Sequence, residues 1–205
     1  MGITYSDLAI SLDGFVAGPD QSADFPIGRL ADGSQARDLL FGWRFGAAEA
    51  DRAEVAEVVD SIVDAGAFIM GRNMFGPDRG DWDLDWTGWW GEDPPYHGPV
   101  YVLTHHEREP LPMQGGTTFH FVTDGIESAL AQARAAAGEH NISIAGGAST
   151  VNQFLAAGLL DELRLHVSPV TLGAGERLVV TPGSLEAVSS RSAARIAHTV
   201  YRVVR

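Results

Sequence analysis

The sequence of 205 residues contains no cysteine, so disulfide bonds, thiolate nucleophiles and cysteine metal sites are excluded. Positive charge is scarce as well: 14 Lys and Arg residues stand against 27 Asp and Glu residues, and the formal net charge is −13 at pH 7. Nucleic acids and anionic membranes need a basic face, so neither is an expected partner. A phosphorylated small molecule needs only a few local donors, and this charge does not exclude one.

Long apolar runs are also missing, and none approaches the length of a membrane-spanning helix. Residues 1–7 lack the charged and apolar regions of a signal peptide. The hydrophobic content of 45% and the charged content of 20% are typical of a soluble globular protein. At this length one domain is the default, so we expect a single domain over residues 1–205, located in the cytoplasm.

Hydrophobic periodicity predicts strands that alternate with helices through most of the chain. Short apolar runs indicate buried strands, and apolar residues at helical spacing indicate amphipathic helices. Alternation of the two implies a parallel sheet. We expect strands at residues 3–11, 67–70, 100–103, 118–122 and 142–145, and helices at residues 49–65, 125–137 and from 149 or 150 to 157.

The C-terminal part is predicted to be strand after strand. Apolar residues at positions 163, 165 and 167 alternate with Arg164, His166 and Ser168, which is the pattern of a half-buried strand. A short strand is expected at 177–180, and residues 185–190 are expected to pair antiparallel with residues 196–204. The fold class is therefore α/β, with a mixed, mostly parallel central sheet, flanking helices and a C-terminal antiparallel strand pair.

Two long segments have no strong periodicity. Residues 19–46 are polar and glycine-rich, and we expect a lid or binding loop with one short helix there. Residues 77–99, called the tryptophan loop below, are acidic and contain four of the five tryptophans. This loop is expected to pack its tryptophans over the domain or against a second subunit. Its apolar surface, with that of the terminal strands, predicts a homodimer.

Residues 141–155 combine a short buried strand, the glycine pair Gly146–Gly147 and the start of a helix. Glycines let the backbone approach a phosphate, and free N–H groups with the positive end of a helix hold its charge. The alternative is an ordinary tight turn between a strand and a helix. The spacing matches neither the dinucleotide-binding G-x-G-x-x-G pattern nor the P-loop.

Two further strand ends carry polar groups. The sequence Gly-Arg-Asn at 71–73 follows one predicted strand, and Thr-His-His at 104–106 follows the next. Ligands bind at the carboxyl ends of strands in an open α/β sheet, so three such ends predict a site for a phosphate-rich ligand. Adjacent residues on an extended chain point to opposite sides, so His105 and His106 are not expected to chelate one metal ion.

Asp13 follows the first strand, within the turn sequence Leu-Asp-Gly at 12–14. Its carboxylate either caps this turn or stands at the strand end beside a ligand crevice. The residues alone leave both interpretations open.

In their order and spacing, these motifs resemble the dihydrofolate-reductase-like superfamily. Within it, the chain is similar over nearly its whole length to the branch named for the C-terminal reductase domain of the riboflavin-biosynthesis deaminase-reductase. The motifs that carry the resemblance are Ser11-Leu-Asp-Gly14, Ile69-Met-Gly-Arg-Asn-Met-Phe75, Tyr101-Val-Leu-Thr-His-His106, Ile144-Ala-Gly-Gly147, Leu160-Asp-Glu-Leu-Arg-Leu-His-Val-Ser-Pro169 and Leu172-Gly-Ala-Gly175.

The resemblance implies an NADPH-dependent reductase that transfers a hydride to a small heterocyclic or carbonyl substrate. Asp13 is then the catalytic residue, which positions the substrate or relays a proton, and the peptide between Gly146 and Gly147 is cis. The implied cofactor contacts are Ala9, Ile10, Val16 and Ala17 at the nicotinamide, Gly71, Arg72, Asn73 and Met74 at the adenosine phosphates, Thr104, His105 and His106 at the 2′-phosphate, and Gly146, Gly147, Ala148, Ser149 and Thr150 at the pyrophosphate.

One departure from the superfamily bears on the substrate. Dihydrofolate reductases carry a carboxylate on the first long helix, and the matching position here is Val55, with Glu54 and Glu57 the nearest acids. Dihydrofolate is therefore a less favoured substrate. The alternatives to the proposed reductase are a non-catalytic NADP(H)-binding protein and, less favoured, a dihydrofolate reductase.

Overall fold

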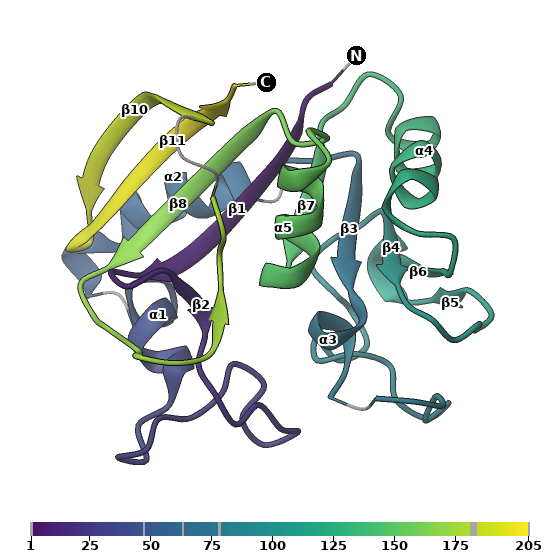
Figure 1. Ribbon diagram of the computed structural model, residues 1–205, viewed down its shortest axis with the longest axis horizontal. Coiled ribbons are helices and arrows are strands. Elements are labelled where there is room, and N and C mark those ends of the chain that lie inside the picture. Colours follow the sequence, from purple (N-terminus) through teal and green to yellow (C-terminus); the bar gives the residue numbers. More distant parts are fainter. Residues whose placement is uncertain (1, 47, 63, 78, 181–183, 205) are drawn as a thin grey trace.

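The computed structural model describes residues 2–46, 48–62, 64–77, 79–180 and 184–204. Among them, nine strands form one sheet in the order β10-β11-β8-β1-β7-β3-β4-β6-β5 (Figure 1). The strands of this sheet are β1 (Thr4–Ser11), β3 (Ala67–Gly71), β4 (Pro99–Leu103), β5 (Leu111–Pro112), β6 (Thr118–Val122), β7 (Ile142–Gly146), β8 (Glu162–Ser168), β10 (Leu185–Ala193) and β11 (Ile196–Val203). Strands β2 (Phe15–Ala17) and β9 (Glu176–Arg177) form a separate pair.

The central strands β8, β1, β7, β3, β4 and β6 are paired in parallel. Antiparallel pairing adds β11 and β10 on one side and β5 on the other. The predicted mixed, mostly parallel sheet with a C-terminal antiparallel pair is therefore confirmed. The strand predicted at 177–180 is wrong in extent. Strand β9 spans only Glu176–Arg177, where it pairs with β2.

The helices lie close to their predicted positions. The helix predicted over 49–65 begins with a 3-10 turn at Glu49–Asp51, continues as α2, and ends by Ile62; Val63 lies outside the described residues. The helices are α1 (Ala36–Phe45), α2 (Arg52–Ile62), α3 (Arg72–Phe75), α4 (Ile126–Ala137) and α5 (Ala148–Ala156), and a second 3-10 turn spans Gln114–Gly116.

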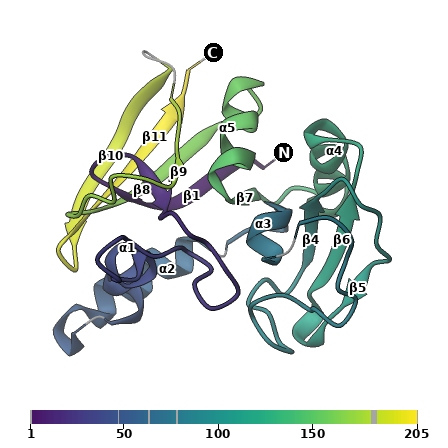
Figure 2. The same ribbon diagram turned by 60° about the horizontal axis from the view of Figure 1, so that its bottom comes forward.

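Helices cover both faces of the sheet (Figure 2). Helices α4 and α5 pack against the face to which Leu8 and Ile10 of β1 contribute. Successive side chains of a strand point to opposite faces, so Ala9 lies on the other face, where it packs against Ala36 and Leu40 of α1. A sheet covered on both faces explains why β1 is apolar along most of its length.

The half-buried strand predicted at β8 is present, but its polar side chains do not all face solvent. His166 and Ser168 are buried, because α1 covers the face on which they lie. The Ser168 hydroxyl donates a hydrogen bond of 2.9 Å to the Leu40 carbonyl, and the Trp43 ring lies 5.1 Å from the His166 ring. The alternation in the sequence therefore separates an apolar face from a polar face that α1 partly covers.

The tryptophan loop packs over its own domain. The rings of Trp82 and Phe75 are 5.8 Å apart, and Trp90 stacks on Phe119 at 5.9 Å. Trp86 packs against the same cluster, and its Nε1 donates a hydrogen bond of 2.9 Å to the Phe75 carbonyl. Since these rings are partly buried within the domain, they do not form the free apolar surface on which the dimer prediction partly depended.

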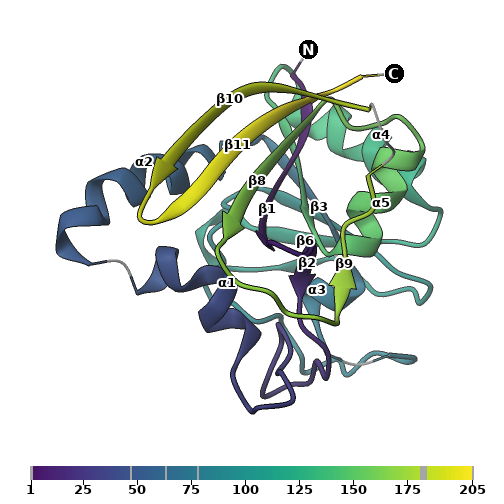
Figure 3. The ribbon, with the colours of Figure 1, turned by 60° about the vertical axis from the view of Figure 1, so that its left-hand side comes forward.

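The C-terminal hairpin is anchored by α1 and α2. Figure 3 shows β10 and β11 curving toward these helices at the turn that joins the two strands. Ile196, at the start of β11, is buried together with Trp43 of α1 and with Val55 and Val58 of α2. The apolar stripe of α2 is therefore used to hold the hairpin.

Candidate active site

A cavity of about 670 Å³ lies at the carboxyl ends of β1, β3, β4 and β7. These strands are neighbours, with Met70 paired to Gly146 and Gly71 paired to Leu103, so the three predicted strand ends meet there. Ile10 and Asp13 are absent from the lining of this cavity. The predicted residues that do line it are Ala9, Val16, Ala17, Gly71, Arg72, Asn73, Met74, Thr104, His105, His106, Gly146, Gly147, Ala148, Ser149 and Thr150.

The glycine pair joins β7 directly to α5. The Gly146–Gly147 peptide is cis, as the resemblance implied. Gly147 is the N-cap of α5, without a capping side chain, and a Cβ at this position would meet no protein atom within 4 Å. The first amides of α5 thus face a cavity with the positive end of the helix behind them, an arrangement suited to an anion.

Gly71 allows β3 to approach the start of α5. A Cβ on Gly71 would lie 2.5 Å from Thr150 Oγ1, which is closer than real Cβ contacts. This approach brings the end of β3 and the first turn of α5 to one wall of the cavity.

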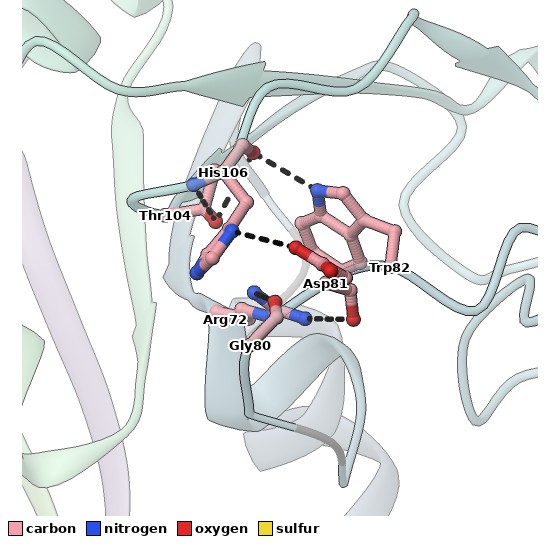
Figure 4. A network of polar contacts seen from close by, with 6 residues as sticks. All are labelled: Arg72, Gly80, Asp81, Trp82, Thr104 and His106. Atoms are coloured by element: carbon pink, nitrogen blue, oxygen red, sulfur yellow. Dashed lines mark hydrogen bonds and ion pairs between the residues drawn. The ribbon is translucent and has the colours of Figure 1, made fainter.

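Arg72 is held by the tryptophan loop (Figure 4). Its guanidinium donates one hydrogen bond to the Gly80 carbonyl and another, of 3.1 Å, to the Asp81 carbonyl. The guanidinium carbon also lies 3.8 Å from the centre of the Trp82 ring. The sequence did not predict these contacts, which fix the position of the Arg72 charge at the wall of the cavity.

The end of β4 is tied to the same loop (Figure 4). The His106 amide donates to Thr104 Oγ1 at 3.1 Å, Trp82 Nε1 donates to the His106 carbonyl at 2.9 Å, and His106 Nδ1 lies 3.6 Å from Asp81 Oδ1. His105 is exposed at the rim. Within the described part of the chain, no cluster of three or more His, Asp or Glu side chains is suited to a metal ion.

Asp13 fastens two loops together. Its Oδ1 accepts hydrogen bonds from the Ser11 hydroxyl at 2.6 Å and from the Leu172 amide at 3.1 Å, and its Oδ2 accepts one from the Gly173 amide at 2.7 Å. These donors, the Ser11 hydroxyl first, hold the pKa of Asp13 at about 2. The contacts are those of a turn cap, and the structure does not bring Asp13 together with the residues that line the cavity.

The buried acid that lines the cavity is Asp7, which the sequence analysis missed; the exposed Glu176 lines it as well. The Asp7 side chain is 3% exposed, and its Oδ1 lies 2.5 Å from His166 Nε2. Its Oδ2 is buried and meets no hydrogen-bond partner among the described residues. An acid in the middle of an apolar strand was a signal in the sequence, because a buried carboxylate needs a partner. The partner could not be identified, since His166 lies 159 residues away in the chain.

His166, which contacts Asp7 through Nε2, also contacts His198 through Nδ1. The two Nδ1 atoms are 2.6 Å apart, and His198 Nε2 lies 3.2 Å from the Ala193 carbonyl oxygen. The Trp43 ring lies 5.1 Å from each imidazole. Burial, reinforced by the neighbouring His166, lowers the pKa of His198. Asp7, His166 and His198 thus form a buried chain, called the Asp7 chain below, across β1, β8 and β11.

Arg44 of α1 and Tyr96 also line this end of the cavity. Burial lowers the pKa of Arg44, and the nearby Asp7 opposes this shift. Burial raises the pKa of Tyr96 above its usual value of 10.0. Near neutral pH the cavity therefore offers a guanidinium cation and a neutral phenol, beside the apolar side chains of Phe41 and Trp90.

The fold is that of a dihydrofolate-reductase-like α/β protein, in which the ends of central strands surround a cavity. The chain belongs to the RibD C-terminal domain family, whose model matches residues 4–200. Membership of this family supports an oxidoreductase-type enzyme with a riboflavin-type, reductase-like role.

The sequence identity to individual relatives is low. The uncharacterised Bacillus subtilis (strain 168) protein YyaP is 26% identical over 184 residues, which are 85% of this chain and 78% of YyaP. A Shewanella sp. PV-4 protein, provisionally named a riboflavin biosynthesis protein, has a similar structure, with a TM-score of 0.62, 21% identity and 99% of each chain covered. Dihydrofolate reductase from Enterococcus faecalis, complexed with NADP(H) and RAB-propyl, has a TM-score of 0.56 and 14% identity, over 98% of this chain and 96% of that enzyme.

Among the described residues, no helix has the length and apolar character needed to cross a membrane.

Proposed function

We propose that this protein is an NADPH-dependent reductase of a small heterocyclic or carbonyl substrate. The observation that carries the proposal is the open backbone at Gly147, where uncapped amides of α5 face a cavity that also contains Gly71 and Thr104. The volume of about 670 Å³ lies within the range of about 300–1,000 Å³ that is usual for ligand pockets. The Enterococcus faecalis enzyme of similar fold was solved with NADP(H), which supports the choice of cofactor.

The residues present fit a dinucleotide phosphate. Gly146 to Thr150 would hold the pyrophosphate through backbone amides, since a helix start without a capping side chain has N–H groups to donate. Gly71 to Met74 would adjoin the adenosine phosphates, and Thr104 to His106 the 2′-phosphate. Ala9, Val16 and Ala17 would border the nicotinamide with small apolar surfaces. When bound, NADPH supplies a hydride.

The substrate would occupy the end of the cavity beside Asp7, Arg44 and Tyr96. The dihydrofolate alternative is less favoured, because Val55 packs with Val58 and Val59 of α2 against Ile196 of the C-terminal hairpin. No α2 residue whose side chain the structure describes lines the cavity. The alternative of a non-catalytic NADP(H)-binding protein predicts cofactor binding without turnover.

Cofactor titration and turnover test the proposal together. We expect NADPH to bind about tenfold or more tightly than NADH, since a hydrogen bond to a charged group contributes about 1.5–3 kcal/mol. Binding is measured by fluorescence, and turnover by NADPH oxidation against a panel of pterins, ribosylaminopyrimidines and small ketones. Equal dissociation constants for the two cofactors would contradict the 2′-phosphate assignment. Absence of binding would refute the function.

We also propose a homodimer formed through the C-terminal hairpin. Strand β10 is the outermost strand of the sheet and is exposed along most of its length, with Val188 53% exposed. An exposed edge strand has unpaired backbone groups that a second copy can pair. Sedimentation should give dimer mass at micromolar concentration, and monomer mass would contradict this assembly.

A further inference from the structure

The proposed substrate end of the cavity contains a carboxylate oxygen that has no hydrogen-bond partner among the described residues. Asp7 lines the cavity with a side chain that is 3% exposed. Oδ1 contacts His166, whereas Oδ2 is buried and unsatisfied within the described part of the chain. Burial of a polar atom without a hydrogen bond costs free energy. The arrangement is therefore suited to a ligand that shares a hydrogen with Asp7: the C=N or C=O group of a substrate accepts from the protonated carboxyl, and the N–H or O–H group of the reduced product donates to the carboxylate.

The hydrogen bonds of the Asp7 chain determine how many protons it holds. The Ala193 carbonyl only accepts, so His198 Nε2 carries a hydrogen. The Nδ1–Nδ1 contact of 2.6 Å needs a second hydrogen, and the contact of 2.5 Å between His166 Nε2 and Asp7 Oδ1 needs a third. Two neutral imidazoles and a carboxylate supply only two. The fully hydrogen-bonded chain therefore holds one additional proton and is electrically neutral.

This additional proton can move along the chain without rotation of any side chain. When it is on Asp7, both imidazoles are neutral; when it is on an imidazole, Asp7 is a carboxylate. Burial lowers the pKa of His198, which favours the forms with the proton nearer to Asp7. Among the described side chains, the charged groups that face the chain are Arg44 from α1, Arg164 from β8 and Arg191 from β10, and α2 contributes the apolar Val58.

We propose that Asp7 is the catalytic residue that protonates the substrate, with His166 and His198 as positioning residues that keep the proton available. For the transfer, the Asp7 carboxyl turns about its Cβ–Cγ bond, so that the oxygen that carries the proton faces the cavity. This proposal rests on the proposed reductase function. Reduction of a C=N or C=O bond adds a hydride to carbon and a proton to nitrogen or oxygen. Bound NADPH would supply the hydride, and Asp7 would supply the proton and be left as a carboxylate. A proton from water then reloads the chain at His198, which borders a second cavity of about 130 Å³.

The surroundings of Asp7 also restrict the substrate. Arg44 lines the same part of the cavity with a guanidinium that only donates hydrogen bonds, and Phe41 and Trp90 supply aromatic surface. These groups suit a flat conjugated molecule whose reducible C=N or C=O bond lies at Asp7 and whose acceptor or anionic group reaches Arg44.

The central variant is Asp7→Asn. Asparagine resembles protonated Asp7, because its amide donates to His166 Nε2 and leaves both imidazoles neutral, yet it has no proton to transfer. The variant should fold and bind NADPH with wild-type affinity. Its turnover of the best substrate in the panel should fall about 100-fold or more, the usual range for loss of a general acid. Asp38→Asn, which removes an exposed charge from α1, is the matched control and should match wild type.

A second measurement needs neither cofactor nor substrate. Protein with isotope-labelled histidine is taken from about pH 5 to about pH 10, and the ring nitrogens of His166 and His198 are followed by NMR. A proton that is transferable near neutrality must leave the Asp7 chain within this range. In wild type both rings should change together as the proton leaves. Asp7→Asn should abolish this joint transition. Wild-type rings without a joint transition would overturn the proposal.

The outcomes separate this proposal from the proposed function. A wild type that does not bind NADPH refutes the function, whatever the ring titration shows. A wild type and an Asp7→Asn variant with equal turnover leave the function intact and overturn the role of Asp7. His198→Phe should shift the pH profile of kcat with NADPH affinity preserved, and an unchanged profile overturns the positioning role. If wild type binds NADPH but reduces no member of the panel, the ring titration alone decides.

Discussion

Gly71 and Thr150 lie so close together that a Cβ on Gly71 would come within 2.5 Å of Thr150 Oγ1. The contact joins the end of β3 to the first turn of α5, two segments that both line the cavity. A glycine at position 71 therefore serves the site through its small size. The Thr150 Cβ would be 3.9 Å away, so the hydroxyl alone creates the conflict.

Gly71→Ala should destabilise the protein by about 1–3 kcal/mol, the usual cost of overpacking a tight site. Thr150→Ala removes the hydroxyl that the new methyl group would meet, so the double variant should recover most of the loss. Urea unfolding of the wild type, both single variants and the double variant measures this coupling. Additive effects of the two substitutions would show that the contact is not the cause.

Gly147→Ala should weaken NADPH binding about tenfold or more, which corresponds to about 1.4 kcal/mol. The added methyl group meets no protein atom within 4 Å, so it enters the space that the cofactor would fill. Gly42→Ala is the matched control, because its methyl group also meets no neighbour and lies outside the cavity. Both variants should unfold at urea concentrations at or above that of wild type. Undiminished NADPH affinity in Gly147→Ala would remove this support for the dinucleotide site.

Asp81→Asn should strengthen NADPH binding relative to NADH. The Asp81 carboxylate lies 3.6 Å from His106 Nδ1, beside the proposed 2′-phosphate position, where it opposes a second negative charge. Since the side chain is fully exposed, we expect a gain of only about two- to fivefold, which should shrink as salt screens the charges. Asp85→Asn, in the same loop and outside the cavity lining, should change neither affinity.

Asp13→Asn should lower stability by about 1–2 kcal/mol, because one carboxylate oxygen that accepts a hydrogen bond is replaced by a donor. The pKa of Asp13 is held at about 2, below its ordinary value of 3.8, so the unfolded chain binds this proton more readily than the folded protein does. The stability that Asp13 contributes is present above pH 3.8 and is lost as the pH falls through about 2. The variant should lack this part of the acid dependence in thermal unfolding followed at several pH values.

The same variant separates the two interpretations of Asp13. A turn cap predicts reduced stability with turnover close to wild type under conditions where both proteins are folded. A fall in turnover of about 100-fold with unchanged stability would instead identify Asp13 as the catalytic acid.

The order of the elements was accessible from the sequence because each signal is local. Helical spacing in α4 and short apolar runs in β3 and β4 specify their type within a few residues. The convergence of Gly71, Thr104 and Gly146 followed from a general rule, that the carboxyl ends of parallel strands meet at one edge of the sheet. The polar face of β8 was misjudged because the alternation of the strand is compatible with either solvent or a helix over the second face. Only the position of α1 decides between them.

By itself, the sequence determined the alternation of strands and helices, the glycines at the strand ends and the absence of cysteine chemistry, since each of these depends on neighbouring residues or on composition. Only the tertiary structure decided which buried acid lines the cavity. The Asp13 carboxylate accepts hydrogen bonds that hold two loops together. Asp7 instead contacts His166, which is 159 residues away in the sequence, and His166 contacts His198, which is 32 residues away. Trp43 covers both imidazoles. Contacts between such distant residues depend on strand order and helix placement, which no local pattern in the chain specifies.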